Sequence, residues 1–492
     1  MKLTAADLDE LRSLLGDDGV LATEAALFTY EADALTLERR PPDVVVLPRS
    51  TDEVAALVRW ARAKNLPVTP RGAGTGLAGG ATTEQGGLSL SLNRMDRILS
   101  VDESRMLAWV QPGLVNLWLS QQLAPAGLYF APDPASQQVS SIGGNVSTNA
   151  GGPHCLKYGV TLNHVLGIVV VLAGGETVTL GGEAPDSPGF DLLSVVCGSE
   201  GTCAIVTEVC VRLLPVPEGV KTLLFDFDTV EDACRTVSRV IASGIVPAAM
   251  EIMDRHTTRL VEDWLHIGLP VESAAVLLIE VDGPAVTLDP QAERIRALAR
   301  EQHTKSERVA KDAAERALLW KGRKSAFGAY GRAASGFTIM DGVVPRTRLA
   351  EALANVYAFA KEKGLEAGNV FHAGDGNLHP HVLFDANDPV AQADALEVSH
   401  RILRMCIDYG GTISGEHGVG IEKRPMMAEL FAADDLAVME RVRGAFDPDR
   451  RLNPGKILPG GAGCGEAKAR GSFEAMRGFV GQAPPTGEGP WI

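Results

Sequence analysis

The sequence has no long hydrophobic run. Its longest apolar stretches, residues 165–173 and 274–281, are much shorter than the roughly 20 residues that a membrane-spanning helix needs. Residues 1–16 place leucines at helical spacing between acidic side chains, without the basic start, apolar stretch and cleavage site of a signal peptide. The sequence therefore predicts a cytoplasmic protein without a membrane span, which reaches the inner membrane only through a partner.

Cysteines are few, and none of them are closely paired. The seven cysteines form an odd set without a C-x-x-C pair: Cys155, Cys197, Cys203, Cys210, Cys234, Cys406 and Cys464. Such a set fits neither a disulfide framework nor a structural zinc or iron–sulfur site. If this chain handles electrons, a separate partner must therefore take them up.

Positive charge is in deficit, and aromatic residues are scarce. Lys and Arg number 46 against 62 Asp and Glu, which gives a net charge of −16 and argues against nucleic acid or an anionic membrane as the main partner. A small anionic substrate is still compatible, because local fields override net charge. Aromatic residues make up only 5% of the chain, whereas its 53 glycines predict many tight backbone turns.

The 492 residues divide into four segments by composition and hydrophobic pattern. Residues 1–40 predict amphipathic helices that act as a lid or brace. Residues 41–217 begin as β-α-β-loop and continue as short strands with Gly- and Pro-rich turns, and a Pro-Val-Pro-Glu-Gly stretch then marks a boundary near residue 218. Residues 218–459 alternate strands and helices in an α+β pattern. Residues 460–492 lack a core pattern and predict a mobile tail.

A glycine-dense loop, PRGAGTGLAGG, occupies residues 70–80. It contains G-x-G-x-x-G at Gly74, Gly76 and Gly79, a spacing that lets backbone amides approach a pyrophosphate. A Rossmann fingerprint needs a helix after the loop, whereas residues 81–87 are turn-like and lead into a strand, so we reject that fold. The loop is either a phosphate cradle beside Arg71 or a glycine hairpin without a ligand.

Two more loops have the same small, polar character. One is SIGGNVSTNAGG at residues 141–152, which follows Pro132-Asp133-Pro134, and the other is GSEGTCAIVTE at residues 198–208. The side chains at 141–152 are too small to build a core, but such a backbone could lie against a flat ligand and form hydrogen bonds with it. At 198–208 a strand leaves the turn. Three separated loops of this kind point to one long cofactor.

Four of the ten histidines lie in two short glycine-containing motifs, HAGDGNLHPH at residues 372–381 and GEHGVG at residues 415–420. His372 and His379 bracket a Gly-Asp-Gly turn and can converge on one ion. Glu416 would complete three protein ligands and leave a position open for substrate, as in a catalytic divalent-metal site. The alternative is that Asp375 and the histidines only brace a turn through hydrogen bonds.

The three glycine loops resemble the FAD-binding domain of flavoenzymes of the vanillyl-alcohol-oxidase type, over about residues 41–215. The resemblance implies that the first loop holds the pyrophosphate and that the other two flank the adenosine and the isoalloxazine ring. Thr75 and Leu77 occupy the region where some relatives carry a histidine that tethers FAD, so non-covalent FAD is implied. The FAD contacts that it implies are Arg71, Gly72, Gly74, Thr75, Gly76, Gly79, Pro132, Ser141, Gly143, Gly144, Ser147, Asn149, Gly152 and Ile205.

The second half resembles the C-terminal domain of FAD-linked 2-hydroxy-acid dehydrogenases, through HAGDGNLHP, GEHGVG and LNPGKILP at residues 452–459. FTIMDGVVPR at residues 337–346 also matches one branch of that family, the flavin subunits of glycolate oxidases. The implied fold is α+β, with a two-part FAD-binding domain of the vanillyl-alcohol-oxidase type at 41–217 and an α+β substrate and metal domain, or cap, at 218–459.

The same resemblance implies roles for the site residues. His372, His379 and Glu416 would bind zinc or a similar divalent ion, and Asn453 would lie near the flavin. His417 would be the base that accepts the proton of the substrate hydroxyl while the α-hydrogen leaves as hydride to FAD.

The substrate carboxylate needs a cation, and Trp320 to Arg323 match the W-x-x-R spacing of this family. Arg323 is therefore the candidate for bidentate binding, and a solvated helix face is the alternative. Phe327 and Ile339 stand where relatives that oxidise 2-hydroxyglutarate place extra polar residues, which favours a small monocarboxylate. His381 fits neither the pattern of the monocarboxylate enzymes nor that of the 2-hydroxyglutarate enzymes. It could be an additional metal ligand or contact the substrate.

The sequence thus predicts an FAD-dependent dehydrogenase that converts glycolate or D-lactate to the 2-oxo acid and passes electrons to a separate iron–sulfur subunit or a quinone. The alternatives are an enzyme for D-2-hydroxyglutarate, an oxidase that uses dioxygen, and a flavin-binding scaffold without turnover. The four residues His372, His379, Glu416 and His417 argue against the scaffold. The sequence is compatible with a homo-oligomer.

Overall fold

The computed structural model describes residues 3–185 and 189–459, so the predicted tail at 460–492 lies outside the described residues. The strands are β1 (Val20–Leu21), β2 (Val44–Val46), β3 (Val68–Arg71), β4 (Leu88–Ser91), β5 (Ile98–Asp102), β6 (Leu107–Val110), β7 (Leu128–Tyr129), β8 (Val165–Val171), β9 (Thr177–Gly181), β10 (Ile205–Arg212), β11 (Leu214–Pro215), β12 (Gly219–Phe227), β13 (Ala249–Asp254), β14 (Ala275–Gly283), β15 (Ser306–Val309), β16 (Gly336–Ile339), β17 (Glu366–His372) and β18 (Pro380–Phe384). The α-helices are α1 (Ala5–Leu15), α2 (Glu24–Phe28), α3 (Thr51–Ala63), α4 (Asn116–Leu123), α5 (Ile142–Thr148), α6 (Cys155–Tyr158), α7 (Leu192–Val196), α8 (Val230–Ala242), α9 (Arg255–Leu265), α10 (Ala285–Glu301), α11 (Ala313–Lys324), α12 (Ala326–Ala333), α13 (Leu349–Glu362), α14 (Pro389–Asp408), α15 (Met427–Leu430) and α16 (Ala433–Phe446).

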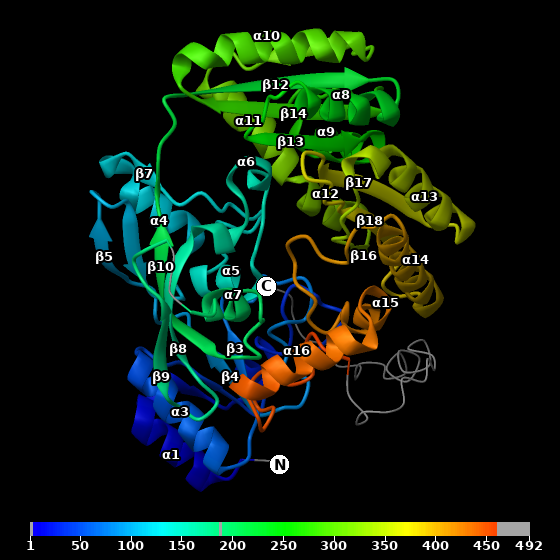
Figure 1. The fold of residues 1–492 in the computed structure, drawn as a ribbon. Helices are drawn as coiled ribbons and strands as arrows, with labels where there is room; N and C mark the ends of the chain where they lie inside the picture. Colours follow the sequence, from blue (N-terminus) through cyan, green and yellow to red (C-terminus); the bar gives the residue numbers. More distant parts are fainter. Residues whose placement is uncertain (1–2, 186–188, 460–492) are drawn as a thin grey trace.

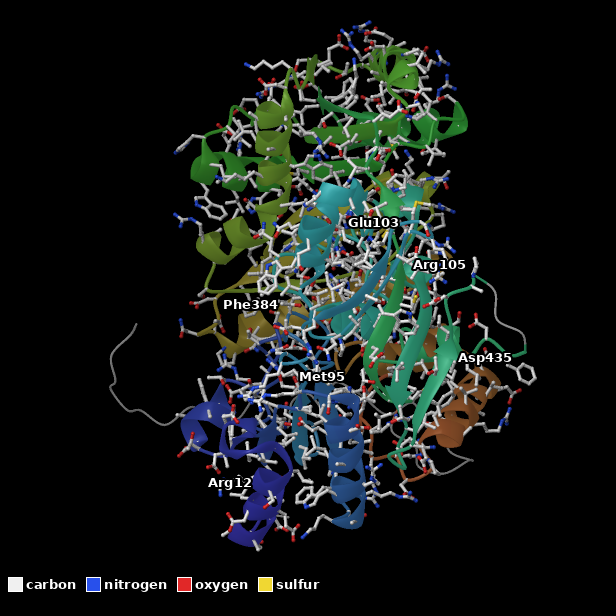
Figure 2. The ribbon with its side chains drawn as sticks, turned by 90° about the vertical axis from the view of Figure 1, so that its left-hand side faces the viewer. Arg12, Met95, Glu103, Arg105, Phe384 and Asp435 are labelled. Atoms are coloured by element: carbon white, nitrogen blue, oxygen red, sulfur yellow. The ribbon has the colours of Figure 1, made fainter. Side chains whose placement is uncertain are left out.

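Three main sheets build the molecule (Figure 1). The first has the order β1-β2-β4-β3 and the second the order β5-β6-β10-β8-β9, and both belong to the first half of the chain. The third has seven strands in the order β15-β12-β14-β13-β17-β18-β16. In Figure 2, α1 with Arg12 lies at the end of the molecule opposite this large sheet. The mixture of helices and sheets confirms the predicted α+β class.

The first sheet forms as its sequence predicts. Strands β2, β4 and β3 are parallel, and α3 connects β2 to β3. Ser50 caps α3 by accepting a hydrogen bond from the backbone N–H of Glu53, which satisfies a free donor at the helix start. Val54, Leu57 and Val58 recur at helical spacing and are buried against the sheet. This unit holds the glycine-dense loop at the end of β3.

Helices cover both faces of the seven-stranded sheet. Successive residues along its strands point to opposite faces, and both sets of side chains are apolar. Leu223 and Phe225 of β12 pack with α8, α10, α13 and α14, whereas Leu224 packs with α9, α11 and α12 on the other face. All its pairings are antiparallel. Within the described residues, no helix has the length and apolar character needed to cross a membrane.

The end of the described chain returns to the first half. After α16, the backbone N–H of Val68 in β3 donates to the carbonyl of Arg451 at 2.9 Å, and Val68 and Leu452 form a parallel bridge. Figure 1 shows α16 beside the first two sheets rather than beside the large one. Residues 433–459 therefore pack against the first half of the chain, although they follow the second half in sequence.

His154 joins the two halves at a partly buried contact. Its Nδ1 lies 2.9 Å from Asp133 Oδ2 and its Nε2 lies 3.4 Å from Glu280 Oε1 on β14. The ring also stacks on Trp320 of α11, with 5.5 Å between centroids. The imidazole thus bridges one carboxylate from each half of the chain.

This bridge predicts a pH-dependent contribution to stability. Burial alone would lower the pKa of His154, but Asp133 and Glu280 outweigh it and raise that pKa to about 10. A raised pKa means that the stabilisation is complete below the ordinary value of 6.5 and is lost as pH rises through about 10. We expect His154→Leu to lower Tm by about 5 °C at pH 6, with the difference shrinking toward pH 10, in thermal unfolding followed by fluorescence. A difference that stays constant across this range would contradict the bridge.

Candidate active site

One cavity of about 650 Å³ lies between the glycine loops and the large sheet. The loops supply one wall, and side chains from the second half, among them Arg323, His379, Glu416 and His417, supply another. Nine of the residues predicted to bind the cofactor line it: Arg71, Gly72, Gly74, Thr75, Gly76, Ser141, Gly143, Gly144 and Ser147. The structure therefore brings the predicted cofactor loops and the predicted catalytic residues together in a single space.

The cofactor wall fits a ligand that lies against backbone. Gly74 has φ +72, a left-handed backbone conformation that favours glycine, and a Cβ there would also force the Arg71 guanidinium to shift. Ser141 caps α5 by accepting the backbone N–H of Gly144 at 3.3 Å. The segment that the sequence analysis treats as open backbone is thus a short helix whose N-terminal turn contributes Gly143 and Gly144 to the cavity.

The N-terminal segment forms part of this wall as well. Asp33 and Ala34 line the cavity, and the backbone N–H of Ala34 donates to the carbonyl of Gly76 at 2.9 Å. Arg71 Nη1 donates to the carbonyl of Ala32 at 2.9 Å. These bonds hold the segment over the first glycine loop, as a brace would.

The other residues predicted to bind the cofactor do not line the cavity. Pro132 accepts a hydrogen bond from Asn116 Nδ2 through its carbonyl, and Ile205 packs into the core of the first sheet. Asn453 Nδ2 donates to the carbonyls of Gly80 and Glu200 at 2.8 and 2.7 Å. The residues in this group are Gly79, Pro132, Asn149, Gly152, Ile205 and Asn453.

His372, His379 and Glu416 converge on one point, and of these three His379 and Glu416 line the cavity whereas His372 does not. Glu416 Oε1 lies 3.3 Å from His372 Nε2 and 3.1 Å from His379 Nε2. Ligands of one tetrahedral zinc ion at bond lengths of about 2.0–2.2 Å are spaced about 3.3 Å apart. His379 Nε2 and Glu416 Oε2 are buried without a hydrogen-bond partner among the described residues. These three side chains therefore fit a divalent metal.

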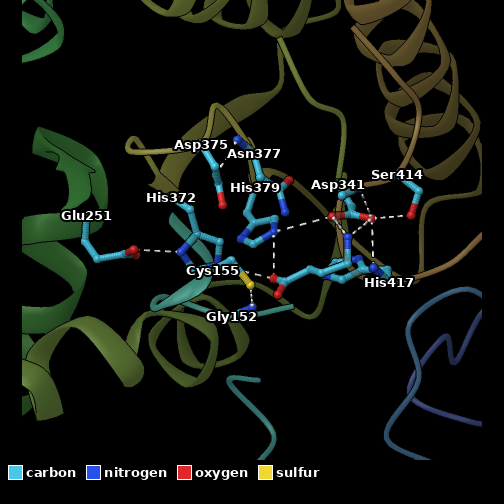
Figure 3. Close-up of polar contacts among 12 residues, drawn as sticks. Gly152, Cys155, Glu251, Asp341, His372, Asp375, Asn377, His379, Ser414 and His417 are labelled. Carbon is cyan, nitrogen blue, oxygen red and sulfur yellow. Dashed lines mark hydrogen bonds and ion pairs between the residues drawn. The ribbon is translucent and has the colours of Figure 1, made fainter. Parts of the chain in front are cut away.

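Glu251 of β13 orients His372. Its Oε1 lies 2.7 Å from His372 Nδ1, a contact visible in Figure 3. This contact turns Nε2 of the same ring toward Glu416 Oε1, 3.3 Å away, and a metal-binding histidine usually makes such a hydrogen bond to a carboxylate through its other ring nitrogen.

Asp341 anchors the loop that carries Glu416 and His417. Asp341, His379, Glu416 and His417 offer ligand atoms within 4.8 Å of one another, a group that includes Asp341 and His417 instead of the predicted His372. The Asp341 carboxylate, however, accepts the backbone N–H groups of Gly415, Glu416 and His417, at 2.9–3.3 Å. It also accepts a hydrogen bond from Lys423 Nζ at 2.9 Å. The oxygens of Asp341 are thus already engaged in hydrogen bonds that hold the loop, rather than being directed at a metal.

His417 is placed to accept a proton. It lines the cavity, and its ring stacks on His379 with centroids 5.2 Å apart. Its Nδ1 is buried and has no hydrogen-bond partner in the part of the chain that the structure describes. Burial, together with the positive charge of Lys423, lowers the pKa of His417 to about 4 even though Asp341 acts in the opposite direction. The ring is therefore neutral near pH 7 and has a free lone pair.

Arg323 of α11 lines the cavity and is only 6% exposed, which excludes the solvated helix face. Its Nε donates to Glu251 Oε2 at 2.5 Å, and its guanidinium makes no other hydrogen bond within the described residues. Phe327 and Ile339 line the same cavity. His381 is buried, stacks on Tyr330 with centroids 4.0 Å apart, and forms a 2.9 Å hydrogen bond from Nδ1 to the carbonyl of His379.

Three carboxylates of the site were not identified from the sequence. Glu251 and Asp341 interrupt apolar segments, and a buried acid in such a segment is the signal that could have singled them out. Glu200 is buried in the third glycine loop with φ +51 and accepts the backbone N–H groups of Val419 and Gly420 at 2.6 and 2.8 Å. It ties this loop to the one that carries Glu416 and His417.

Two family models match the chain in the order of its two halves. Residues 42–181 match the FAD binding domain, and residues 216–457 match the C-terminal domain of FAD linked oxidases. The glycine loops at 70–80 and 141–152 lie in the first match, and the histidine motifs lie in the second.

Curated relatives match over almost the full length. Glycolate oxidase subunit GlcD of Escherichia coli K12 is 44% identical over 94% of this chain and 92% of its own length. The subunit of the same name from Bacillus subtilis is 38% identical, over 92% and 96%. The D-lactate dehydrogenase of Anaerostipes hadrus is 34% identical, over 87% and 92%.

Solved structures share the fold at much lower identity. p-Cresol methylhydroxylase with bound substrate superposes with a TM-score of 0.79 at 18% identity, over 93% of this chain and 98% of the other. An alkyldihydroxyacetonephosphate synthase gives 0.72 at 20% identity, over 92% and 85%. These likenesses confirm the predicted FAD-binding fold of the vanillyl-alcohol-oxidase type. The chain therefore belongs to the family of FAD-linked oxidases and is an FAD-dependent oxidoreductase.

Proposed function

We propose that this enzyme oxidises a short 2-hydroxy acid, glycolate or D-lactate, to the corresponding 2-oxo acid. The observation that carries the proposal is the single cavity, in which the glycine loops face the cluster of His379, Glu416 and His417 beside Arg323. Its similarity to proteins named glycolate oxidase subunit and D-lactate dehydrogenase supports the substrate class.

Each residue at the catalytic end has a role that its contacts support. Arg323, whose two terminal nitrogens make no hydrogen bond with any described residue, would bind the substrate carboxylate. His372, His379 and Glu416 would hold a divalent metal such as zinc, and neutral His417 would accept the proton of the 2-hydroxyl group. FAD, bound non-covalently at the glycine loops, supplies the hydride acceptor, and the metal supplies the Lewis acid that makes the hydroxyl more acidic.

The electron acceptor is proposed to be a separate iron–sulfur subunit or a quinone. The six cysteines of the described residues are all free and lie in different parts of the fold. Similarity to proteins named as subunits supports a physical partner. Attachment of an otherwise cytoplasmic protein to the inner membrane would then depend on that partner. An oxidase would instead form peroxide in step with substrate under air.

Anaerobic bleaching of the flavin tests the proposal. The purified protein is mixed separately with glycolate, D-lactate, L-lactate and D-2-hydroxyglutarate, and absorbance at the flavin maximum is recorded with and without a chelator. We expect glycolate or D-lactate to bleach it rapidly and the chelator to prevent this. Faster bleaching by D-2-hydroxyglutarate would favour the dicarboxylate alternative, whereas a yellow protein that no acid bleaches would contradict 2-hydroxy-acid oxidation.

A further inference from the structure

Glu251 is a buried carboxylate on an apolar sheet face. It lies on β13 and is 1% exposed, and its neighbours on the same face, Ala249 and Met253, belong to the hydrophobic cluster beneath α9, α11 and α12. An ionised carboxylate in such surroundings is costly unless both oxygens are paired. Both are paired, and each oxygen pairs with a residue of the candidate active site.

One oxygen of Glu251 holds the candidate substrate-binding arginine. Oε2 accepts a hydrogen bond from Arg323 Nε at 2.5 Å, and the Arg323 side chain is 8% exposed. This bond uses the nitrogen inside the guanidinium fork and leaves the two terminal nitrogens for a carboxylate. It also fixes the plane of a long side chain that reaches the cavity from α11.

The other oxygen holds a candidate metal ligand. Glu251 and His372 are direct partners across β13 and β17, so their side chains lie on the same face of the sheet. Oε1 lies 2.7 Å from His372 Nδ1, while Nε2 of the same ring lies 3.3 Å from Glu416. The strand register therefore sets the position of His372 relative to Glu251.

We propose that Glu251 is a positioning residue that orients Arg323 and His372 together, so that the substrate carboxylate and the metal are bound at a fixed separation. This inference rests on the proposed function, because it assigns Arg323 to the substrate and His372 to the metal. Glu251 touches neither of them and acts through the two side chains that do.

Glu251→Gln separates this role from packing. A glutamine amide has one acceptor oxygen and one donor nitrogen, so it cannot accept from both Arg323 Nε–H and His372 Nδ1–H. We expect the affinity for Zn²⁺, titrated against a chromophoric chelator in metal-stripped flavoprotein, to fall about 10- to 100-fold. We also expect KM for the acid that bleaches the wild type to rise about tenfold, the cost of a charged hydrogen bond. At saturating Zn²⁺, kcat should approach that of the wild type while KM stays raised.

Glu280→Gln is the matched control. Glu280 lies on the adjacent strand β14, is 1% exposed like Glu251, and also bridges two cationic groups, His154 and Arg316. It does not line the cavity. We expect this variant to lose thermal stability and to retain the Zn²⁺ affinity and KM of the wild type.

The outcomes distinguish this inference from the proposed function. Wild-type Zn²⁺ affinity and KM in Glu251→Gln, or equal losses in Glu280→Gln, would overturn the positioning role. A wild type that binds no Zn²⁺ would contradict the proposed metal chemistry itself. If Glu251→Gln fails to retain FAD, Glu251→Asp decides, because its charge is kept but its side chain is one methylene shorter. The proposal then requires a loss of Zn²⁺ affinity, a raised KM or both in the folded Glu251→Asp variant, and wild-type values of both would overturn it.

Discussion

Replacement of His417 by alanine should slow the reduction of the flavin by substrate about 100- to 10,000-fold, the usual contribution of a general base. The ring is neutral near pH 7 because burial lowers its pKa to about 4, and none of the residues at 3–185 and 189–459 forms a hydrogen bond with its Nδ1. Without the His417 ring, the alternative bases in the same cluster among the described cavity residues are His379 and Glu416. Both of these are assigned to the metal. The measurement is the anaerobic rate of flavin bleaching at saturating substrate in a stopped-flow instrument.

The loop geometry makes this substitution specific to the ring. His417 is held through its backbone N–H, which donates to Asp341 at 2.9 Å, and alanine keeps that bond. The FAD content, read from the visible absorbance, and the metal content should therefore match the wild type. A variant that keeps both and still bleaches at the wild-type rate would remove His417 from the reaction.

The parts of the fold that the sequence predicts well are those governed by local rules. Ser50 begins α3 and the apolar spacing of Val54, Leu57 and Val58 buries one face, so the first β-α-β unit follows from neighbouring residues. Gly74 and Gly76 belong to the motif recognised in the sequence, and both line the cavity; Gly74 also has a φ of +72, which favours glycine. The histidine motifs are recognisable because His372, His379 and Glu416 lie beside glycines rather than on an apolar face.

Features that depend on tertiary contacts were harder to predict. The helix α5 forms in a stretch rich in glycine and β-branched residues, since Ser141 caps it and Ile142 and Val146 pack into the second core. Strand β15, with the sequence Ser-Glu-Arg-Val, has only one apolar residue and is added to the sheet edge through its pairing with β12. The partners of Glu251 come from positions 72 and 121 residues away, a separation that local patterns do not encode.

Buried charge accounts for how the site is held together. Asp341 gathers the backbone of the loop at 414–418, Glu200 ties that loop to the third glycine loop, and Glu251 links two elements of the large sheet and its helices. Each carboxylate accepts hydrogen bonds from donors of a different segment. Removal of one carboxylate would therefore leave buried donors without a hydrogen bond. The overall charge of −16 therefore says little about this end of the cavity, where local pairing decides what each group can bind.

His379→Ala should abolish the metal site while leaving the flavin site intact. Nε2 of His379 lies 3.1 Å from Glu416 Oε1, is buried, and makes no hydrogen bond to a described residue, which is the placement expected of a metal ligand. We expect the variant to contain less than a tenth of the wild-type metal by elemental analysis. Flavin reduction should fall at least about 100-fold, because a Lewis acid contributes several kcal/mol to such a step.

His400→Ala is the matched control for this prediction. His400 Nε2 also lies 3.1 Å from a glutamate oxygen, Glu429 Oε1, but the pair is on α14 and α15 outside the cavity. The His400→Ala variant should keep the metal content, the FAD content and the bleaching rate of the wild type, because an ion pair near the surface contributes little to stability. Added Zn²⁺ should restore the chelated wild type and not His379→Ala. If His379→Ala instead retained metal and bleached normally, the ion would have to be held by another set, and the group of Asp341, Glu416 and His417 would be the one to test.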